Sequence, residues 1–229
     1  MKILKNLIFL LSFIPMVSFG QSNKCSNPVS FGDVVICIPE MLNMTECYSD
    51  PLVNTYANIF KGSSDEKILA FFISNNEYDD LYSTLLEDGL QDPYIKVYST
   101  STVENIYVTK KDLNTVSLGI KSAFDDYEGS DVESSINSKA SELDISFGKP
   151  ILFDEYSLDS NIKSFVAIMN MSAGNESIIM VAVMNLLIVK NRLLFFAYYD
   201  EYRGVDKIEK IKSNSDYFAL SLLAKNQTY

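Results

Sequence analysis

The chain has 229 residues, of which 47% are hydrophobic and 21% charged, a composition that predicts a folded protein rather than a disordered one. Its formal net charge is −11, which disfavours nucleic acid and anionic membrane surfaces as partners. It has no histidine, and this excludes Ser-His-Asp and Cys-His catalysis as well as zinc sites that need a histidine ligand.

Residues 1–20 have the layout of a signal peptide. Two lysines precede the apolar stretch Leu7–Val17, and the small residues Ser18 and Gly20 stand before an expected cut at Gln21. The apolar stretch is shorter than the roughly 20 residues that span a bilayer, so a membrane anchor is the less favoured interpretation. We therefore expect an exported protein, periplasmic or extracellular, with no membrane insertion after cleavage.

The remaining residues, 21–229, are expected to form a single domain. The three cysteines, Cys25, Cys37 and Cys47, all lie near its start, and in an exported chain they predict one disulfide and one thiol. We favour a Cys25–Cys47 pair with Cys37 buried in the apolar segment DVVICIP, although the other pairings stay open. No CxxC motif is present, so the spacing indicates neither a redox centre nor a zinc site.

Short runs of β-branched and aromatic residues, bounded by turn-forming residues, predict strands. Before the most apolar part of the domain, the expected strands are Asp33–Ile38, Leu52–Phe60, Lys67–Ile73, Tyr94–Tyr98, Asn105–Val108 and Lys163–Met171.

The most apolar part, Ile178–Tyr199, is predicted to be a hairpin rather than a membrane span. Its first run, Ile178–Val189, has twelve residues, too few for a spanning helix of about 20. Lys190-Asn191 can form the turn, because Asn tolerates the positive φ that two-residue hairpin loops demand. Both faces of the first strand are apolar, so we expect it at the centre of the sheet, with Asn185 hydrogen-bonded inside.

Helical spacing of apolar residues predicts four helices. The clearest begins with Thr109-Lys110-Lys111-Asp112, in the manner of a capping box, and continues to Phe124. The others are expected at residues 78–86, 130–143 and 205–225, the last with a polar Ser213–Ser215 segment that could split it in two. The order of elements predicts an α+β domain with a largely antiparallel β-sheet flanked by helices.

Several segments together resemble the PsbP-like or Mog-type α/β/α sandwich group. SFVAIMN, the hairpin IIMVAVMNLLIVKNRLLFFAYYDEY and the closing DKIEKIKSNSDYFALSLLAKN resemble its C-terminal half, and VSFGDVVICIPEMLN resembles its opening strand. Members include extrinsic photosystem subunits, a nuclear transport factor, bacterial exported lipoproteins and secretion chaperones. The resemblance, which lies in element order and hydrophobic rhythm, implies mostly non-catalytic binding with a ligand and partner that differ between branches.

Carboxylates are the candidates for acid/base chemistry in a chain without histidine. The pairs Asp154-Glu155 and Asp200-Glu201 lie at expected element ends and could in principle act as in a glycosidase. Adjacent residues of one strand point to opposite faces, so a working pair would have to be assembled across the fold. We therefore expect solvated charges there and predict no catalytic residues.

The acidic segment FDDYEGSD offers oxygen ligands for calcium from Asp125, Asp126, Glu128 and Asp131. The spacing fails the EF-hand pattern, because Phe124 falls at the first ligand position. An acidic loop at the end of a helix is the preferred interpretation, so we expect no metal site and no other cofactor.

Tyrosine and phenylalanine number 14 each, and core packing is the plain explanation for most of them. The sharper hypothesis is a surface made by Tyr198, Tyr199 and Tyr202, at which a partner protein or a small ligand binds. We expect an exported soluble binding or accessory protein without catalytic activity and with an unknown ligand. The alternative is a carboxylate-dependent or metal-assisted hydrolase of glycosidase type.

Overall fold

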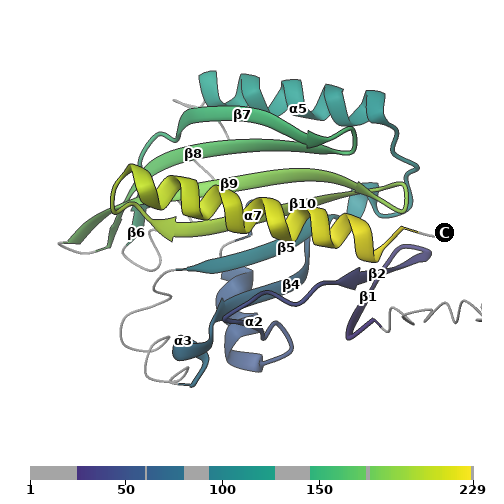
Figure 1. Ribbon diagram of the computed structural model, residues 1–229, viewed down its shortest axis with the longest axis horizontal. Coiled ribbons are helices and arrows are strands. Elements are labelled where there is room, and N and C mark those ends of the chain that lie inside the picture. The colour runs from purple at the N-terminus through teal and green to yellow at the C-terminus, as the bar shows by residue number, and fades with distance from the viewer. Residues whose placement is uncertain (1–24, 60, 80–92, 127–144, 174–175, 228–229) are drawn as a thin grey trace, which may run out of the picture.

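The computed structural model describes residues 25–59, 61–79, 93–126, 145–173 and 176–227. Within them, an eight-stranded antiparallel sheet has the order β3-β4-β5-β10-β9-β8-β6, with β7 also paired to β8 (Figure 1). Its strands are β3 (Met44–Glu46), β4 (Glu66–Ser74), β5 (Tyr94–Thr100), β6 (Ile145–Phe147), β7 (Ile151–Asp159), β8 (Ile162–Ala173), β9 (Glu176–Val189) and β10 (Arg192–Glu201).

A small separate sheet pairs β1 (Asn27–Phe31) with β2 (Val34–Ile38). The helices are α2 (Pro51–Ile59), α3 (Asn75–Asp79), the 3-10 helix η2 (Ser101–Val103), α5 (Lys110–Asp125) and α7 (Val205–Lys225). The architecture is the predicted one, an α+β domain with an antiparallel sheet flanked by helices.

Helix α7 and the β1–β2 hairpin cover one face of the large sheet, with α7 running in front of it in Figure 1. Phe218 of α7 is fully buried, stacks on Phe196 of β10 at a centroid distance of 4.5 Å, and meets Phe72 of β4 edge-on at 5.5 Å. Ile36 and Ile38 of β2 close the same core from the side. This contiguous apolar cluster fixes the position of α7 on the sheet.

The opposite face is covered by two helices in separate clusters. Val53 and Ala57 of α2 pack with Phe71 of β4, whereas Leu113 of α5 packs with Leu186 of β9. Because side chains alternate along a strand, β9 supplies buried residues to both faces of the sheet. It is therefore a central strand, as its doubly apolar pattern predicts.

The predicted hairpin is confirmed, with β9 and β10 paired along their length. Its turn residues Lys190 and Asn191 have φ values of 48° and 60°, the positive values that a two-residue turn of this kind requires. Asn185 is fully buried, and its amide donates to Ser215 Oγ and accepts from Ser164 Oγ, each at 2.7 Å. The prediction that Asn185 is hydrogen-bonded inside the sheet is thus confirmed.

Two predicted helices are confirmed with their boundaries. Thr109 caps α5 through a capping box with Asp112, as its sequence predicts. Helix α7 is continuous from Val205 to Lys225, and its polar segment does not split it. The reason is that Ser215 faces the sheet and hydrogen-bonds with Asn185, so a polar residue in the buried stripe has a polar partner.

The strand predicted at Leu52–Phe60 is wrong, because this segment forms α2. Asp50 Oδ1 accepts from the backbone N–H of Leu52 at 2.9 Å and of Val53 at 3.3 Å, and Pro51 occupies the first helical position. A side-chain cap followed by proline starts a helix strongly. Val53 and Ala57, four residues apart, then face the same buried cluster.

Other predictions differ in smaller ways. Residues 105–108 follow η2 as coil rather than forming a strand, whereas β1, β3, β6 and β7 were not predicted. Of the helix expected at 78–86, the structure describes only residues up to 79, which close α3. The helix expected at 130–143 and the signal peptide at 1–20 lie outside the described residues. No helix within the described ranges has the length and apolar character of a membrane span.

The favoured Cys25–Cys47 disulfide is corrected by the structure, which bonds Cys25 to Cys37 instead. Antiparallel pairing of β1 with β2 brings Cys25 next to Cys37, with 5.5 Å between their Cα atoms. Cys47 is a buried free thiol in the α2 cluster, where its backbone N–H donates to Phe71 O at 2.8 Å. Burial raises the pKa of the Cys47 thiol to about 12.

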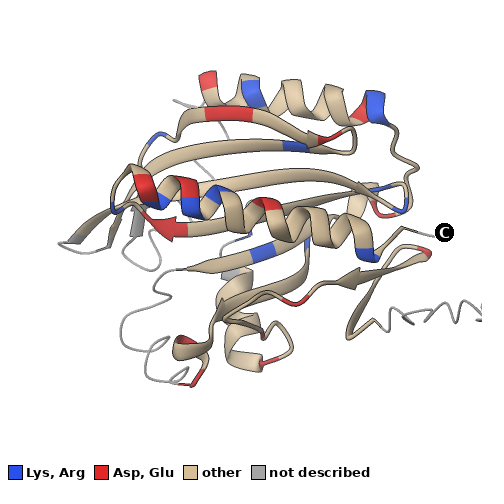
Figure 2. Cartoon of the chain, viewed as in Figure 1, with Lys and Arg blue, Asp and Glu red and all other residues tan. Residues whose placement is uncertain are grey.

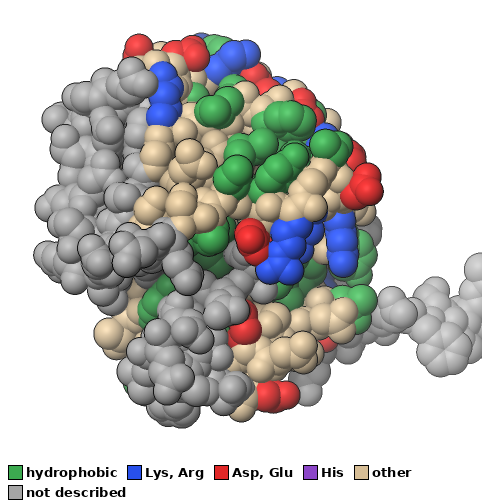
Figure 3. Space-filling model, turned by 90° about the vertical axis from the view of Figure 1, so that its left-hand side faces the viewer, with side chains coloured by type: hydrophobic (Ala, Val, Ile, Leu, Met, Phe, Trp, Pro, Cys, Tyr) green, Lys and Arg blue, Asp and Glu red, His purple; other side chains and the backbone are tan. Residues whose placement is uncertain are grey.

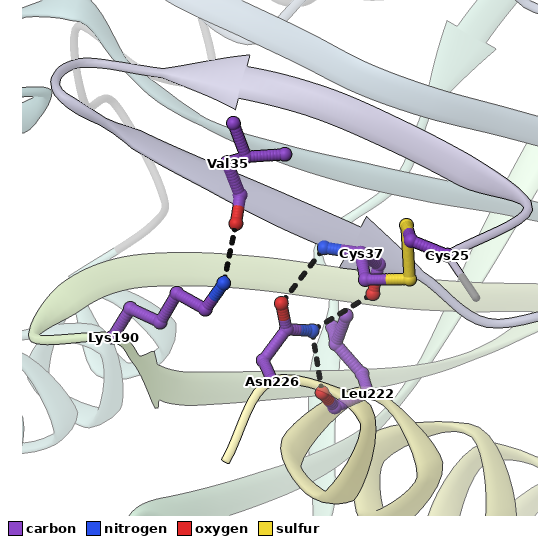
Figure 4. Close-up of a disulfide and its surroundings, with 6 residues drawn as sticks. All are labelled: Cys25, Val35, Cys37, Lys190, Leu222 and Asn226. Atoms are coloured by element: carbon purple, nitrogen blue, oxygen red, sulfur yellow. Dashed lines mark hydrogen bonds between the residues drawn. A yellow bond between two sulfur atoms is a disulfide. The ribbon is translucent and has the colours of Figure 1, made fainter. Parts of the chain in front are cut away.

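A side-chain clamp fastens the end of α7 to this hairpin (Figure 4). Asn226 Oδ1 accepts from the backbone N–H of Cys37 at 2.7 Å, and its Nδ2 donates to the carbonyls of Cys37 and Leu222, both at 2.8 Å. Lys190 Nζ donates to Val35 O at 2.7 Å, which ties the β9–β10 turn to the same hairpin. The β1–β2 hairpin is thus joined to the domain by polar contacts as well as by its core residues.

Candidate functional site

The predicted pair Asp154-Glu155 lies within β7 rather than at an element end, and its two side chains point to opposite faces. Asp154 Oδ2 accepts from Lys212 of α7 at 2.7 Å, and Glu155 Oε2 accepts from Lys121 of α5 at 2.8 Å. The two carboxylates therefore do not face a common space, as alternation along a strand predicts.

The pair Asp200-Glu201 at the end of β10 is separated in the same way. Asp200 is only 4% exposed and forms an ion pair with Lys207 of α7 at 2.6 Å. Glu201 pairs with Arg203 at 2.5 Å near the surface. All four carboxylates of the two predicted pairs thus have a cationic partner.

A fifth acidic residue, Asp216 of α7, which the sequence analysis did not single out, contacts β7. The hydroxyl of Tyr156 in β7 donates to Asp216 Oδ1 at 2.7 Å, and Lys212 lies over the Tyr156 ring at 4.8 Å. Burial raises the pKa of the Asp216 carboxyl above its usual range, although the Tyr156 hydroxyl and Lys212 act in the opposite direction. This cluster lies between β7 and α7 and supports their packing.

The three tyrosines of the predicted partner surface are not brought together. Tyr198 is 3% exposed and belongs to the core beneath α7. Tyr199 points to the other face, where it stacks on Tyr94 at a centroid distance of 4.6 Å, and Tyr202 is half-buried against the α7 core. Adjacent strand residues cannot share a face, so a surface made jointly by Tyr198 and Tyr199 is corrected by the structure.

The only charges buried on the second face, within the described residues, form a pair. Lys96 Nζ donates to Glu66 Oε1 at 2.9 Å, with both side chains less than a tenth exposed, and lies over the Tyr98 ring at 4.5 Å. The attraction between the two charges and the contact with the Tyr98 ring offset part of the hydration that burial removes. Each of the two charges therefore has a partner within the protein.

An open pocket of about 470 Å³ lies between the first half of α7 and the corner where β3, β4 and α3 meet. On the sheet side, Met44 of β3 pairs with Ser74 of β4, so the two residues lie side by side. Asn75 and Asn76 of α3 continue this wall, and Asn43 precedes it in a left-handed conformation with φ 61°. The Asn75 side-chain carbonyl accepts from Thr45 Oγ1 at 2.9 Å.

Helix α7 and β10 provide the other wall. We call this cavity the α7 pocket. Tyr198 and Asp200 alternate on the α7 face of β10, while the helix contributes Lys207, Lys210, Ile211 and Asn214. These helix positions are three or four residues apart and so share one face. Figure 2 shows that most charged residues of α7 lie in its first half, and Figure 3 views the molecule from that end.

No group of metal-ligating side chains large enough to hold an ion occurs among the described residues. Of the acidic segment considered for calcium, Asp125 ends α5 and Asp126 is its C-cap. Glu128 and Asp131 lie outside the described residues.

Comparison with known proteins gives a likeness of fold. No family model matches the chain, and no curated protein matches it. Among solved structures, the crystal structure of the Ran-binding protein Mog1p of Saccharomyces cerevisiae is similar, with 7% sequence identity and a TM-score of 0.34. The match covers 84% of this chain and 86% of Mog1p. At this TM-score the likeness bears on neither ligand nor partner.

Proposed function

We propose that the protein is an exported binding protein that holds a small ligand in the α7 pocket without changing it chemically. The observation that carries the proposal is the pocket itself, because its two walls come from parts of the chain far apart in sequence and meet around a shared space. Its volume of about 470 Å³ lies within the range of about 300–1,000 Å³ that is usual for small-molecule sites.

The state of the carboxylates supports binding over hydrolysis. A glycosidase needs two carboxyl groups that face one substrate from opposite sides. Here Asp154 and Glu155 point to opposite faces, and Asp200 is held by Lys207 at 2.6 Å. No observation in the described residues favours the hydrolase alternative.

The compartment belongs to the same proposal. The leader layout at residues 1–20 supports export to the periplasm or the extracellular space, with no membrane insertion after cleavage. Loss of Lys2 and Lys5 with the leader would change the net charge from −11 to −13, which further disfavours nucleic acid as a partner. Intact-mass measurement of the isolated protein tests this part, with Gln21 as the expected first residue.

The binding proposal is tested by incubating the purified protein with a small-molecule extract of its own cells, separating it by gel filtration, and identifying what it retains by mass spectrometry. The variant Asn214→Trp fills the α7 pocket, so it should lose the retained compound while keeping its thermal melting curve. The double variant Asp154→Asn with Glu155→Gln, outside the pocket, serves as the matched control and should retain it.

Two results would contradict the proposal. One is retention that Asn214→Trp leaves unchanged. The other is turnover of a glycan substrate by the wild-type protein that the carboxamide double variant abolishes, because the hydrolase alternative would then replace binding.

A further inference from the structure

We infer that the α7 pocket takes a small organic oxyanion, a carboxylate or phosphate ester attached to a short apolar body. The inference rests on the proposed function and specifies the chemistry of its ligand. Its main recognition group is Lys210, which the sequence pattern does not distinguish from other surface lysines.

The charge of the pocket is opposite to that of the protein. The whole chain has a net charge of −11, yet the pocket is lined by two lysines and one carboxylate. Asp200 and Lys207 neutralise one another at 2.6 Å, and their side chains are 5% and 26% exposed. Lys210 remains as the unbalanced charge of the lining. A local positive site on a negative surface attracts anions and repels cations.

Lys210 forms no ion pair with the described acids of its own helix. Asp206 and Glu209 are exposed residues of α7, and neither lines the pocket. Asp206 is four residues from Lys210, a spacing at which an exposed pair contributes only about 0.2–0.5 kcal/mol in an isolated helix. No ion pair to Lys210 occurs among the described residues, so its ammonium is available to a ligand in the pocket.

The neutral groups of the pocket add hydrogen-bond donors. Because the side-chain carbonyl of Asn75 accepts from Thr45, its amide NH2 is the group left for a ligand. The start of α7 lies nearby, and its N-cap Gly204 offers no side-chain oxygen to the first-turn N–H groups. Asp206 in this first turn opposes the positive end of the helix dipole, so Lys210 and the Asn75 amide are the groups that would recognise the anion.

The floor of the pocket is apolar. Met44, Tyr198 and Ile211 line it and are each less than a tenth exposed. A charged rim above an apolar floor fits a ligand that has an anionic head and an apolar body, and it fits a sugar poorly because hydroxyl groups on the body would lose their hydration.

The inference is tested with four probes that share a phenyl ring and differ in the charge of the head group: benzoate, phenyl phosphate, benzamide and benzylamine. Each is titrated into the ¹⁵N-labelled exported protein while backbone amide shifts are followed. Benzoate, phenyl phosphate or both should cause saturable shifts at Asn75, Lys210 and Asn214. Benzamide and benzylamine should bind at least about tenfold more weakly than the better anion, because neither has an anionic group to accept a hydrogen bond from Lys210. The two anions differ only in head group, so their relative affinities separate carboxylate from phosphate recognition.

The variant Lys210→Glu should weaken the better anion by about tenfold or more, and Lys210→Gln should weaken it to an intermediate degree. Lys225→Glu, at the other end of the same helix, changes the net charge equally and should leave the affinity within about twofold. Lys210 and Lys225 are both exposed, so both variants should stay folded, with melting temperatures lowered by no more than a few degrees through charge effects on α7.

The inference is overturned if benzamide or benzylamine binds as tightly as benzoate, if neither anion shifts the pocket amides, or if Lys210→Glu and Lys225→Glu have the same effect. These results are distinct from failure of the proposed function. A neutral or cationic compound retained from the cell extract and lost in Asn214→Trp would leave the binding function standing while contradicting the anion assignment.

Discussion

Replacing Asn226 by alanine removes the clamp between the end of α7 and the β1–β2 hairpin. The side chain is 5% exposed and satisfies both the N–H and the C=O of Cys37, itself 7% exposed. The Asn226 amide bonds to both the backbone N–H and the backbone C=O of Cys37, as a neighbouring β-strand would do. Alanine leaves both groups without a partner.

The expected cost follows from those two groups. Leaving a buried backbone donor or acceptor unsatisfied costs about 1–3 kcal/mol, so Asn226→Ala should lower the free energy of unfolding by about 2–6 kcal/mol. Water that enters the vacated space would bring the loss toward the lower end of that range. The third hydrogen bond, from Asn226 Nδ2 to Leu222 O at 2.8 Å, lies at the helix end, where water replaces it easily.

Urea unfolding of the oxidised protein measures this loss, and hydrogen exchange reports it locally. The amide of Cys37 should exchange much faster in Asn226→Ala than in the wild-type protein. Gln227→Ala, at the next and exposed position, is the matched control and should change stability by less than about 0.5 kcal/mol. A loss in Asn226→Ala as small as that of the control would refute the reasoning.

Three further predictions concern the core, the cysteines and pH. Val183→Asp should unfold the domain, because Val183 is fully buried in a central strand and an unpaired carboxylate there costs several kcal/mol; a soluble variant with an unchanged melting temperature would contradict this. Peptide mapping without reduction should link Cys25 to Cys37, and Cys47 should resist alkylation until the protein is unfolded; a Cys25–Cys47 peptide would show the pairing to be wrong. Because burial raises the folded-state pKa of Asp216, its contribution to stability is present at low pH and is lost as pH rises through that pKa. The stability of Asp216→Asn relative to wild type should therefore increase between about pH 3 and pH 7, and no change over this interval would count against the burial argument.

The parts of the fold that could be predicted are those whose signal is local. The capping box at Thr109 and Asp112 fixes the start of α5, and the positive-φ turn at Lys190-Asn191 fixes the register of β9 with β10. The prediction failed where strand-forming residue types were outweighed by a helix cap and by tertiary packing. At α2 the β-branched and aromatic residues suggested a strand, whereas the Asp50 cap and burial of one side by β4 decide for a helix.

The disulfide and the candidate site depend on long-range placement instead. Cys25 meets Cys37 only because β1 turns back along β2, a pairing whose first strand was not predicted. Lys210 and Asn75 approach one pocket because β4 and β10 are separated by a single strand of the sheet. No spacing within the sequence encodes that proximity, so an asparagine and a lysine at these positions look like ordinary surface residues.

The central claim, that the α7 pocket is the binding site, is tested most directly by hydrogen–deuterium exchange of the purified protein with and without a small-molecule extract of its cells. The account predicts slower exchange in three segments far apart in sequence, residues 42–44, 74–76 and 207–214, and no change in β7. Asn214→Trp should abolish the effect. Protection located elsewhere, or protection that survives this substitution, would contradict the claim.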